Sequence, residues 1–233
     1  QTIEGDLKSF NLNYIDWRKP RRNRFHVTVE YSVERARSTE TARPDIVLFV
    51  NGIPFCVIEC KAPPTEVKQA ISQSVRNQSD DYIPRLFVYA QLLLGVNKNG
   101  GKYATVGSAA KFWMEWKELY LGKDETRELH KLQEVVNQPL EESIASEVAA
   151  TLEVQRDRLD GERLVTEQDK VIYSLCRPER LLELAWKFVV FDGGIKKIAR
   201  YQQYFVIKSI FNRIQQVEHD GSRKGGIIWQ TQG

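Results

Sequence analysis

Cysteine and histidine are scarce in this sequence. The three cysteines, Cys56, Cys60 and Cys176, show no C-x-x-C spacing and are odd in number, so they indicate neither a disulfide framework nor a zinc ribbon. The three histidines are scattered. No apolar run reaches about 18 residues, the length expected of a membrane-spanning helix. These absences exclude a disulfide-rich secreted protein and a membrane-spanning one, and they favour the reducing cytoplasm.

A strong charge of either sign is also missing. The 233 residues carry a formal net charge of +3, with 28% charged and 42% hydrophobic residues, which is an ordinary globular composition. Such a weak positive balance permits nucleic-acid binding but does not argue for it. The length allows one large domain, or one domain and part of another. Because the chain begins with Gln1 and its one methionine is Met114, we expect a fragment of a longer protein.

What the sequence does contain is a strong hairpin signal. Two apolar runs, residues 46–50 and 53–58, are joined by Asn51-Gly52, a dipeptide that favours a tight two-residue turn. The few charged residues of this region stand at the far end from the turn, namely Asp45, Glu59 and Lys61. We therefore expect a buried β-hairpin with a small group of charges at its open end.

The charged end of the hairpin has the composition of a magnesium site. Side chains alternate along a strand, so Glu59 and Lys61 project to one face, and the hairpin brings Asp45 beside them. Mg²⁺ takes oxygen ligands and keeps several waters, so two carboxylates are enough protein to hold it. Such a metal activates water near a phosphate, while a lysine neutralises charge on the phosphorus oxygens. The residues therefore predict phosphodiester hydrolysis, with Asp45, Glu59 and Lys61 as catalytic residues.

The turn and the metal site impose conflicting registers on this hairpin. A regular ladder closed by a two-residue turn places Asp45 opposite Ile58, on the face away from Glu59. Two carboxylates on opposite faces cannot hold one cation. We therefore predict that the turn includes Ile53 or that a bulge lies near Pro54, with the two carboxylates within about 6 Å of each other.

The same residues carry a family resemblance. Pro44-Asp45 followed by Glu59-Cys60-Lys61 resembles the PD-(D/E)xK nuclease motif. The longer string RPDIVLFVNGIPFCVIECKAP, residues 43–63, is similar to the restriction subunit of type I restriction-modification enzymes. The resemblance implies an α/β fold whose PD-(D/E)xK restriction-endonuclease-like core is a mixed sheet flanked by helices. After this core it implies a mostly helical segment that leads into a RecA-like motor domain.

The resemblance also implies a function. It describes a Mg²⁺-dependent double-stranded DNA endonuclease that acts within an ATP-dependent type I restriction enzyme, after motor-driven translocation. The implied partners are double-stranded DNA and the methylation and specificity subunits of that complex, with no membrane contact. The implied metal ligands are Asp45, Glu59 and the backbone carbonyl of Cys60.

A Q-x-x-x-Y motif on the helix after the hairpin is a further implication of the resemblance. The spacing from Lys61 points to Gln73, with Asn77 where tyrosine is expected. The literal motif occurs five residues later, from Gln78 to Tyr82. We take Gln73 as the catalytic member and keep Gln78 and Tyr82 as the alternative.

The remaining pattern divides the chain into three expected regions. These are a nuclease domain at residues 1–120, a helical linker region at 121–190 and the start of a motor at 191–233. Strands are expected at residues 24–33, 86–89, 92–96 and 102–106. Helices are expected at residues 65–82, 125–137, 139–156, 166–175, 178–189 and 196–217.

Two side-chain clusters outside the hairpin each allow two interpretations. Phe112, Trp113 and Trp116 either fill a gap between the domain and the linker or stack on an unpaired base. The basic residues among positions 18–24 belong either to a solvated loop or to a contact with phosphate backbone.

The end of the chain resembles the start of a superfamily 2 motor. Arg200-Tyr201-Gln202-Gln203 resembles the Q motif, in which a glutamine reads the adenine edge, and residues 224–233 resemble the strand before a phosphate-binding loop. The implied ATP-binding residues are Arg200, Gln203 and Gly233. Because the sequence G-K-[ST] is absent, we do not expect this chain alone to bind ATP usefully. An ordinary amphipathic helix before a strand is the alternative.

Two other functions are compatible with these residues. One is a PD-(D/E)xK fold kept only as a DNA-binding module, against which the intact Asp45, Glu59 and Lys61 argue. The other is a nuclease-helicase of DNA repair or phage defence that acts without a specificity subunit. Only sequence from the motor and the C-terminal part of the protein would separate this second function from a restriction enzyme.

Overall fold

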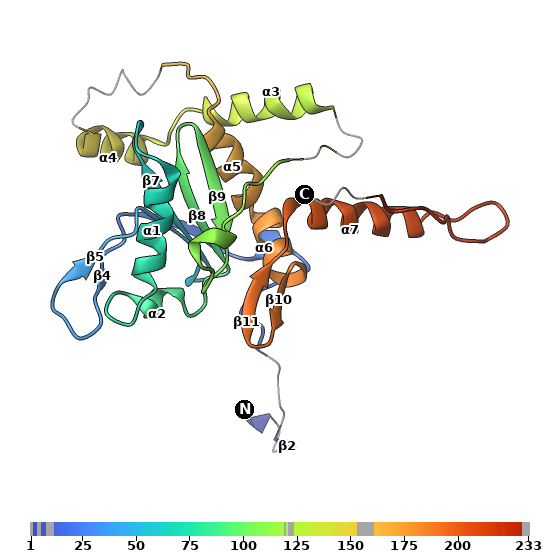
Figure 1. Cartoon of the computed structure of the whole chain (residues 1–233), viewed down its shortest axis with the longest axis horizontal. Coiled ribbons are helices and arrows are strands. Elements are labelled where there is room, and N and C mark those ends of the chain that lie inside the picture. Colours follow the sequence, from blue (N-terminus) through green and yellow to red (C-terminus); the bar gives the residue numbers. More distant parts are fainter. Residues whose placement is uncertain are drawn as a thin grey trace.

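The computed structural model describes residues 2–3, 6–7, 12–118, 120, 124–152 and 161–229 (Figure 1). Its strands are β1 (Thr2–Ile3), β2 (Asp6–Leu7), β3 (Phe25–Val29), β4 (Val33–Glu34), β5 (Thr41–Ala42), β6 (Ile46–Val50), β7 (Ile53–Lys61), β8 (Leu92–Asn97), β9 (Gly100–Ala104), β10 (Val189–Asp192) and β11 (Ile195–Ile198). Its α-helices are α1 (Val67–Asn77), α2 (Pro84–Phe87), α3 (Glu125–Val136), α4 (Glu142–Leu152), α5 (Glu167–Cys176), α6 (Pro178–Lys187) and α7 (Tyr201–Ile214). Two short 3-10 helices are η1 (Pro20–Arg22) and η2 (Ala110–Phe112).

A mixed sheet with the strand order β3-β6-β7-β8-β9 forms the centre of the molecule. β7 and β8 run parallel, and the other neighbouring pairs are antiparallel. A parallel pair needs a crossover connection, and the segment that contains α1 and α2 supplies it. Figure 1 shows α1 lying across the sheet, where it packs on β7 and β8. The expected α/β core, a mixed sheet flanked by helices, is confirmed.

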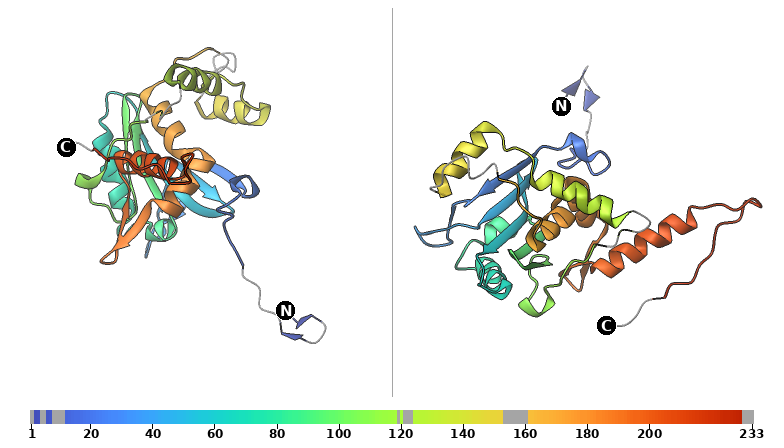
Figure 2. Two further views of the ribbon diagram at one scale, coloured as in Figure 1. Left: turned by 90° about the vertical axis from the view of Figure 1, so that its right-hand side faces the viewer. Right: turned by 90° about the horizontal axis from the view of Figure 1, so that it is seen from above.

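Each face of the sheet packs against its own group of helices. On one face, Val47 and Val57 share a hydrophobic cluster with Ile71 of α1 and with residues of α2. On the other face, Ile58 and Leu94 share a cluster with residues of α5, α6 and α7. The right-hand view of Figure 2 shows α7 extending away from the sheet, with the chain after it running back alongside.

Local signals explain where several helices begin. Pro84 and Pro178 occupy the first turn of α2 and α6, where a missing N–H removes no hydrogen bond. Thr166 and Asp169 form a reciprocal capping box at the start of α5. The Asp124 side chain accepts a hydrogen bond from a backbone N–H in the first turn of α3. Among the described residues no helix combines the length and apolarity that a membrane crossing requires.

The strand expected at residues 86–89 is wrong. The helix α2 occupies the first half of this segment, and its apolar residues Leu86 and Phe87 are buried against the α1 face of the sheet. A short apolar run fits a buried turn of helix as well as a strand. Pro84, which presets a helical φ angle, decides between them here. The strand expected at residues 24–33 is interrupted for a similar local reason, because Glu30 has a φ of 46° and ends β3.

The single helix expected at residues 196–217 is also wrong in its first part. β10 and β11 form an antiparallel hairpin, and α7 begins only at Tyr201. The turn between the strands contains Gly193 and Gly194, with φ angles of 56° and 79°. Only glycine adopts this left-handed backbone without strain, so the Asp-Gly-Gly sequence was the available hairpin signal.

Residues 224–229 do not form the strand that the phosphate-loop resemblance implied. A strand is stabilised by pairing with a neighbour and by burial of its apolar side chains. In this structure Ile227 and Trp229 are 94% and 88% exposed. Residues 230–233, with Gly233 among them, lie outside the described part of the chain.

The expected domain boundary near residue 120 does not separate two hydrophobic cores. Tyr103 of β9 is fully buried in the same cluster as Leu175, Leu181 and Phe205, which belong to α5, α6 and α7. Its hydroxyl donates a hydrogen bond to the carbonyl of Ala199 at 2.8 Å. The described residues of the expected motor region therefore form β10, β11 and α7 on the surface of the nuclease-like core, and they do not show a RecA-like fold.

The two tryptophans of the aromatic cluster are core residues. Trp113 and Trp116 are 4% and 7% exposed and lie in the clusters on opposite faces of the sheet. The predicted packing between the domain and the linker is confirmed for Trp116, whose cluster includes residues of α5 and α6, whereas Trp113 packs among residues of the expected nuclease domain and Phe112 is exposed.

Candidate functional site

A β-bulge in the β6–β7 hairpin resolves the conflict between the turn and the site. The two-residue turn is present, since Asn51 and Gly52 both have positive φ angles, 51° and 82°. The pairing then shifts by one residue between Leu48 and Phe49. Phe55 is the extra residue on β7, and it and Cys56 both enter the cluster on the α5 side. Of the two predicted alternatives, a bulge near Pro54 is confirmed and a turn that includes Ile53 is not found.

The bulge places the two carboxylates on one face of the sheet. Beyond it Ile46 pairs with Ile58, so the next residues outward, Asp45 and Glu59, lie opposite each other. The Asp45 carboxylate accepts a hydrogen bond from the backbone N–H of Cys60 at 2.6 Å. The charge of Asp45 is close enough to raise the pKa of Glu59. The predicted proximity of these carboxylates therefore follows from one irregular residue in β7.

The helix α1 supplies polar partners to this face. Gln73 donates a hydrogen bond from Nε2 to Glu59 Oε2 at 2.6 Å and accepts one from Lys61 Nζ at 2.5 Å. Asn77, one turn later, donates from Nδ2 to Glu59 Oε1 at 2.8 Å. The side chains of Lys61, Gln73, Glu59 and Asn77 thus form one chain of hydrogen bonds.

Gly95 allows α1 to approach the sheet closely at this point. It is the residue of β8 that pairs with Glu59. A Cβ atom added to it would lie 3.2 Å from the Ile71 side chain and 3.3 Å from that of Ala70, both on α1. The missing side chain therefore permits the short distance between the helix and the sheet that brings Gln73 and Asn77 to Glu59.

The electrostatics of the site favour a bound cation. Glu59 is fully buried, and this burial raises its pKa to about 8, with the neighbouring charge of Asp45 adding to the effect and Lys61 opposing it. A carboxylate in such surroundings is stabilised either by a proton or by a metal ion that takes the proton's place.

The donor set fits magnesium rather than zinc. Asp45 and Glu59 offer carboxylate oxygens, and Cys60, which stands between Glu59 and Lys61, has a backbone carbonyl as a further oxygen. Within the described ranges no group of three or more histidine, cysteine, aspartate or glutamate residues could hold a metal ion. Zinc sites usually need at least three such side chains, whereas Mg²⁺ binds through one or two carboxylates and retains water.

The alternative pair Gln78 and Tyr82 lies outside this hydrogen-bonded group. Gln78 accepts a hydrogen bond from the Gly107 N–H at 2.9 Å and donates one to the Ser74 carbonyl at 3.0 Å. The ring of Tyr82 lies beneath the guanidinium of Arg35, 4.4 Å from its centroid. The structure therefore brings Asp45, Glu59, Lys61 and Gln73 together, and it adds Asn77 and Gly95, whose roles the sequence reasoning did not assign.

The other sequence candidates lie away from the carboxylates. The Gln203 side chain accepts a hydrogen bond from the Arg200 N–H at 2.9 Å and so caps α7. The basic cluster of residues 18–24 adjoins the hairpin turn, since the Arg24 N–H donates to Asn51 at 2.7 Å. It therefore lies at the opposite end of β6 from Asp45.

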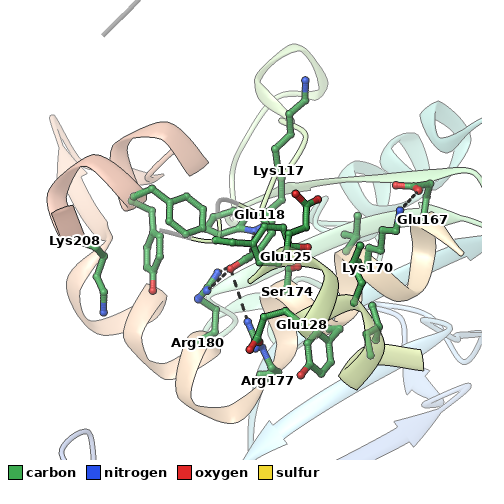
Figure 3. A pocket seen from close by; sticks show the side chains of 18 of the residues that line it. Lys117, Glu118, Glu125, Glu128, Glu167, Lys170, Ser174, Arg177, Arg180 and Lys208 are labelled. Carbon is green, nitrogen blue, oxygen red and sulfur yellow. Dashed lines mark hydrogen bonds and ion pairs between the residues drawn. The ribbon is translucent and has the colours of Figure 1, made fainter. Parts of the chain in front are cut away.

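A cavity of about 540 Å³ lies on the α5 side of the sheet, bordered by α3, α5, α6 and α7 (Figure 3). Arg180 lines this cavity and donates hydrogen bonds to both carboxylate oxygens of Glu118, at 2.8 and 3.1 Å. Its guanidinium carbon lies over the ring of Tyr204, 4.6 Å from the ring centroid. Burial alone would raise the pKa of Glu118, but the hydrogen bonds and charge of Arg180 outweigh it and lower the pKa. This ion pair ties the segment after β9 to α6 and forms no part of the carboxylate site.

Comparison with known proteins shows a similarity to type I restriction enzymes. Residues 2–112 match the family model described as type I restriction enzyme R protein N terminus. A protein of Methanocaldococcus jannaschii, named for the endonuclease subunit of the type I restriction enzyme MjaIXP, is 28% identical over 98% of this chain. The type I restriction enzyme HindI endonuclease subunit of Haemophilus influenzae is 27% identical over 100% of it.

The chain spans 20% and 19% of the length of these two relatives. A shorter match, 32% identical over 42% of the chain and 10% of the relative, is to the SsaAORF53P endonuclease subunit of Staphylococcus saprophyticus. The matched residues include the β6–β7 hairpin, α1 and the sheet that carries them. Residues 2–112, which include the carboxylate site, therefore match the N-terminal region of type I restriction enzyme R proteins, and nearly the whole chain is similar to endonuclease subunits of these enzymes.

Proposed function

We propose that this chain is the nuclease part of a type I restriction enzyme R protein and that it hydrolyses phosphodiester bonds of double-stranded DNA with Mg²⁺. The observation that carries the proposal is the bulge at Phe55, which puts Asp45 opposite Glu59 on the face where Lys61 and Gln73 lie. Bulges are frequent next to active sites, where they redirect side chains, and this one redirects Glu59.

Each side chain of the group has a distinct chemical role. Asp45, Glu59 and the Cys60 carbonyl would hold Mg²⁺, which when bound polarises the scissile phosphate and lowers the pKa of a coordinated water. Lys61 places its ammonium beside the carboxylates, where it orients the attacking water or neutralises charge on the phosphorus oxygens. Gln73 fixes that ammonium through its Oε1 while its Nε2 holds Glu59.

The wider assignments belong to the same proposal. In the full-length protein, Arg200, Gln203 and Gly233 would contribute to an ATP site of the motor that drives translocation. Methylation and specificity subunits would provide the context in which cleavage occurs. The support is the match of residues 2–112 to the family model and the names of the relatives, which are endonuclease subunits of type I restriction enzymes.

The test uses the full-length R protein assembled with its partner subunits. We expect Asp45→Ala, Glu59→Ala and Lys61→Ala to abolish DNA cleavage while ATP hydrolysis and translocation stay near those of the unchanged protein. Gln73→Ala should reduce cleavage roughly 10–100-fold, because it removes a hydrogen-bonding partner of the proposed ligand and of the lysine.

Gln78→Ala is the matched control, since it removes the same side chain immediately after the same helix and outside the hydrogen-bonded group. Cleavage that survives in folded Asp45→Ala and Glu59→Ala proteins would refute the proposal. An unchanged protein that binds DNA but never cleaves it, with or without Mg²⁺, would support the DNA-binding module instead.

A further inference from the structure

We infer that Asn77 is a positioning residue of the metal site, which holds the carboxylate of Glu59 in the orientation that a divalent cation requires. This inference deepens the proposed function and rests on it. None of the relatives' names and no part of the family description assigns a role to this asparagine.

Asn77 donates a hydrogen bond to one of the two oxygens of the Glu59 carboxylate. Its Nδ2 donates to Oε1 at 2.8 Å, while Gln73 donates to Oε2 at 2.6 Å. Each carboxylate oxygen therefore has its own amide donor from α1, one helical turn apart. A carboxylate held at both oxygens cannot rotate about its terminal bond, so the lone pairs that remain keep a fixed direction.

Burial strengthens the hydrogen bond between Asn77 and Glu59, because water cannot replace either partner. Asn77 is 2% exposed and Glu59 is fully buried, so water does not compete for either group. Within the described part of the chain, the Oδ1 atom of Asn77 has no hydrogen-bond partner. Burying an amide whose oxygen has no hydrogen-bond partner costs folding free energy. The hydrogen bond that the Asn77 side chain does form goes to Glu59.

The position of Asn77 depends on the close approach of α1 to the sheet. Asn77 ends the helix, and Gly95 lies beside Glu59 on the next strand. The short side chain of asparagine reaches Oε1 of Glu59 directly, whereas a longer polar side chain would have to fold back on itself in the narrow space between α1 and the sheet. The inference is therefore that α1 carries two positioning amides, from Gln73 and Asn77, and that each acts on a different oxygen of one proposed ligand.

The test measures Mg²⁺ binding by isothermal titration calorimetry and by the shift of the thermal unfolding midpoint on adding Mg²⁺. Asn77→Leu preserves the size of the side chain and removes its donor, and Asn77→Ala is the second variant in case leucine prevents folding. We expect either folded variant to bind Mg²⁺ about 10–100-fold more weakly than the unchanged chain, which is the typical effect of removing a hydrogen-bonding partner of a ligand.

Ser74→Ala is the matched control. Ser74 is a fully buried polar residue on the same helix, its Oγ has no partner within the described residues, and it donates nothing to Glu59. The control should keep the Mg²⁺ affinity of the unchanged chain even if it changes the unfolding midpoint without metal.

The outcomes separate the inference from the proposed function. If the unchanged chain and the Ser74→Ala protein bind Mg²⁺ and folded Asn77 variants bind it equally well, the positioning role is wrong while the metal site stands. If the unchanged chain binds no Mg²⁺ and the alanine variants of Asp45 and Glu59 behave like it, the proposed function fails before the inference is reached. A loss of affinity shared by the Ser74→Ala protein would show a general effect of helix α1 and would also overturn the inference.

Discussion

At the scale of single residues, Glu59 is a carboxyl group whose ionised form the fold tolerates poorly without a cation. It is fully buried at the end of β7, and its two amide partners do not neutralise it. Burial and the nearby Asp45 raise its pKa to about 8, against the effect of Lys61. The protein thus keeps an unfavourable arrangement of two carboxylates, as sites that bind a divalent metal ion do.

Replacing Glu59 by glutamine should therefore have opposite effects with and without metal. In EDTA at a pH of about 9 or above, beyond the pKa of about 8 at which Glu59 is half ionised, Glu59→Gln removes a buried charge, and we expect it to raise the free energy of unfolding by roughly 1–3 kcal/mol. With millimolar Mg²⁺ the unchanged chain should gain stability and the variant should not. Urea unfolding in both buffers measures this. A variant that is less stable in EDTA and equally stabilised by Mg²⁺ would show that Glu59 is not a ligand.

At the scale of elements, the distance between α1 and the sheet determines which side chains reach the carboxylates. Gly95 sets this distance, because a Cβ there would press against Ile71 and Ala70 at 3.2–3.3 Å. Contacts of this length force the neighbouring helix to shift by a few tenths of an ångström or more. Both Gln73 and Asn77 lie on the helix that would move.

We expect Gly95→Ala to lower the free energy of unfolding by about 1–3 kcal/mol, as overpacking does, and to reduce cleavage more than this loss of stability explains. Gly100→Ala is the control, since a Cβ at Gly100 meets nothing within 4 Å. Chemical unfolding of the chain and cleavage by the assembled enzyme provide the two measurements. A Gly95→Ala enzyme with normal cleavage would contradict the role assigned to the approach of α1.

The hairpin shows how far sequence reasoning reaches at this scale. The turn at Asn51-Gly52, both strands and the need for a bulge near Pro54 could be predicted, because turn chemistry and the pairing of Asp45 with Glu59 constrain each other. The partners on α1 were only partly predictable. The motif spacing gives Gln73 and also the position of Asn77, where tyrosine is expected. The contact of this asparagine with Glu59 was not predictable, because it depends on the close approach of α1 at Gly95, a residue of a different strand.

Elsewhere, short apolar runs misled the prediction. The run at residues 86–89 gives the same periodicity in a strand and in a buried turn of helix, so only tertiary packing decides its form. The hairpin of β10 and β11 carried a local signal in Gly193 and Gly194, but the apolar and basic residues after it also suit a helix. This hairpin is held by residues far away in the sequence, as the hydrogen bond from Lys196 Nζ to the Ala90 carbonyl shows. A local sequence pattern cannot predict such a contact.

At the scale of the whole molecule, residues from both sides of the expected domain boundary share one core. The ion pair of Arg180 with Glu118 ties the segment after β9 to α6, and Tyr204 and Phe205 of α7 lie under the same guanidinium. Sheet, linker and α7 therefore form one unit, so that the chain as a whole should unfold cooperatively.

Glu118→Gln tests this coupling through its dependence on pH. The pKa of Glu118 is lowered in the folded state, so its ion pair stabilises the fold fully above the unfolded-state pKa of about 4.5, and this contribution disappears as the pH falls through the folded-state pKa. We expect Glu118→Gln to lower the free energy of unfolding by about 2–3 kcal/mol at pH 7 and to flatten its decline below about pH 4.5.

Glu167→Gln should change the free energy of unfolding by less than about 0.5 kcal/mol, because its pair with Lys170 is exposed. Urea titrations between neutral and acidic pH measure both variants. Equal pH profiles for Glu118→Gln and the unchanged chain would show that the ion pair does not join the linker to α6 in solution.

The most direct test of the central claim is a crystal structure of the chain grown with Mn²⁺, using its anomalous scattering to locate the metal. Mn²⁺ accepts the same oxygen ligands as Mg²⁺ and is easily located. We predict an anomalous peak between Asp45 and Glu59, within about 2.0–2.5 Å of an oxygen of each, and its loss in Asp45→Ala crystals. A structure with Mn²⁺ bound only elsewhere, or with Asp45 and Glu59 on opposite faces of a regular hairpin, would contradict it.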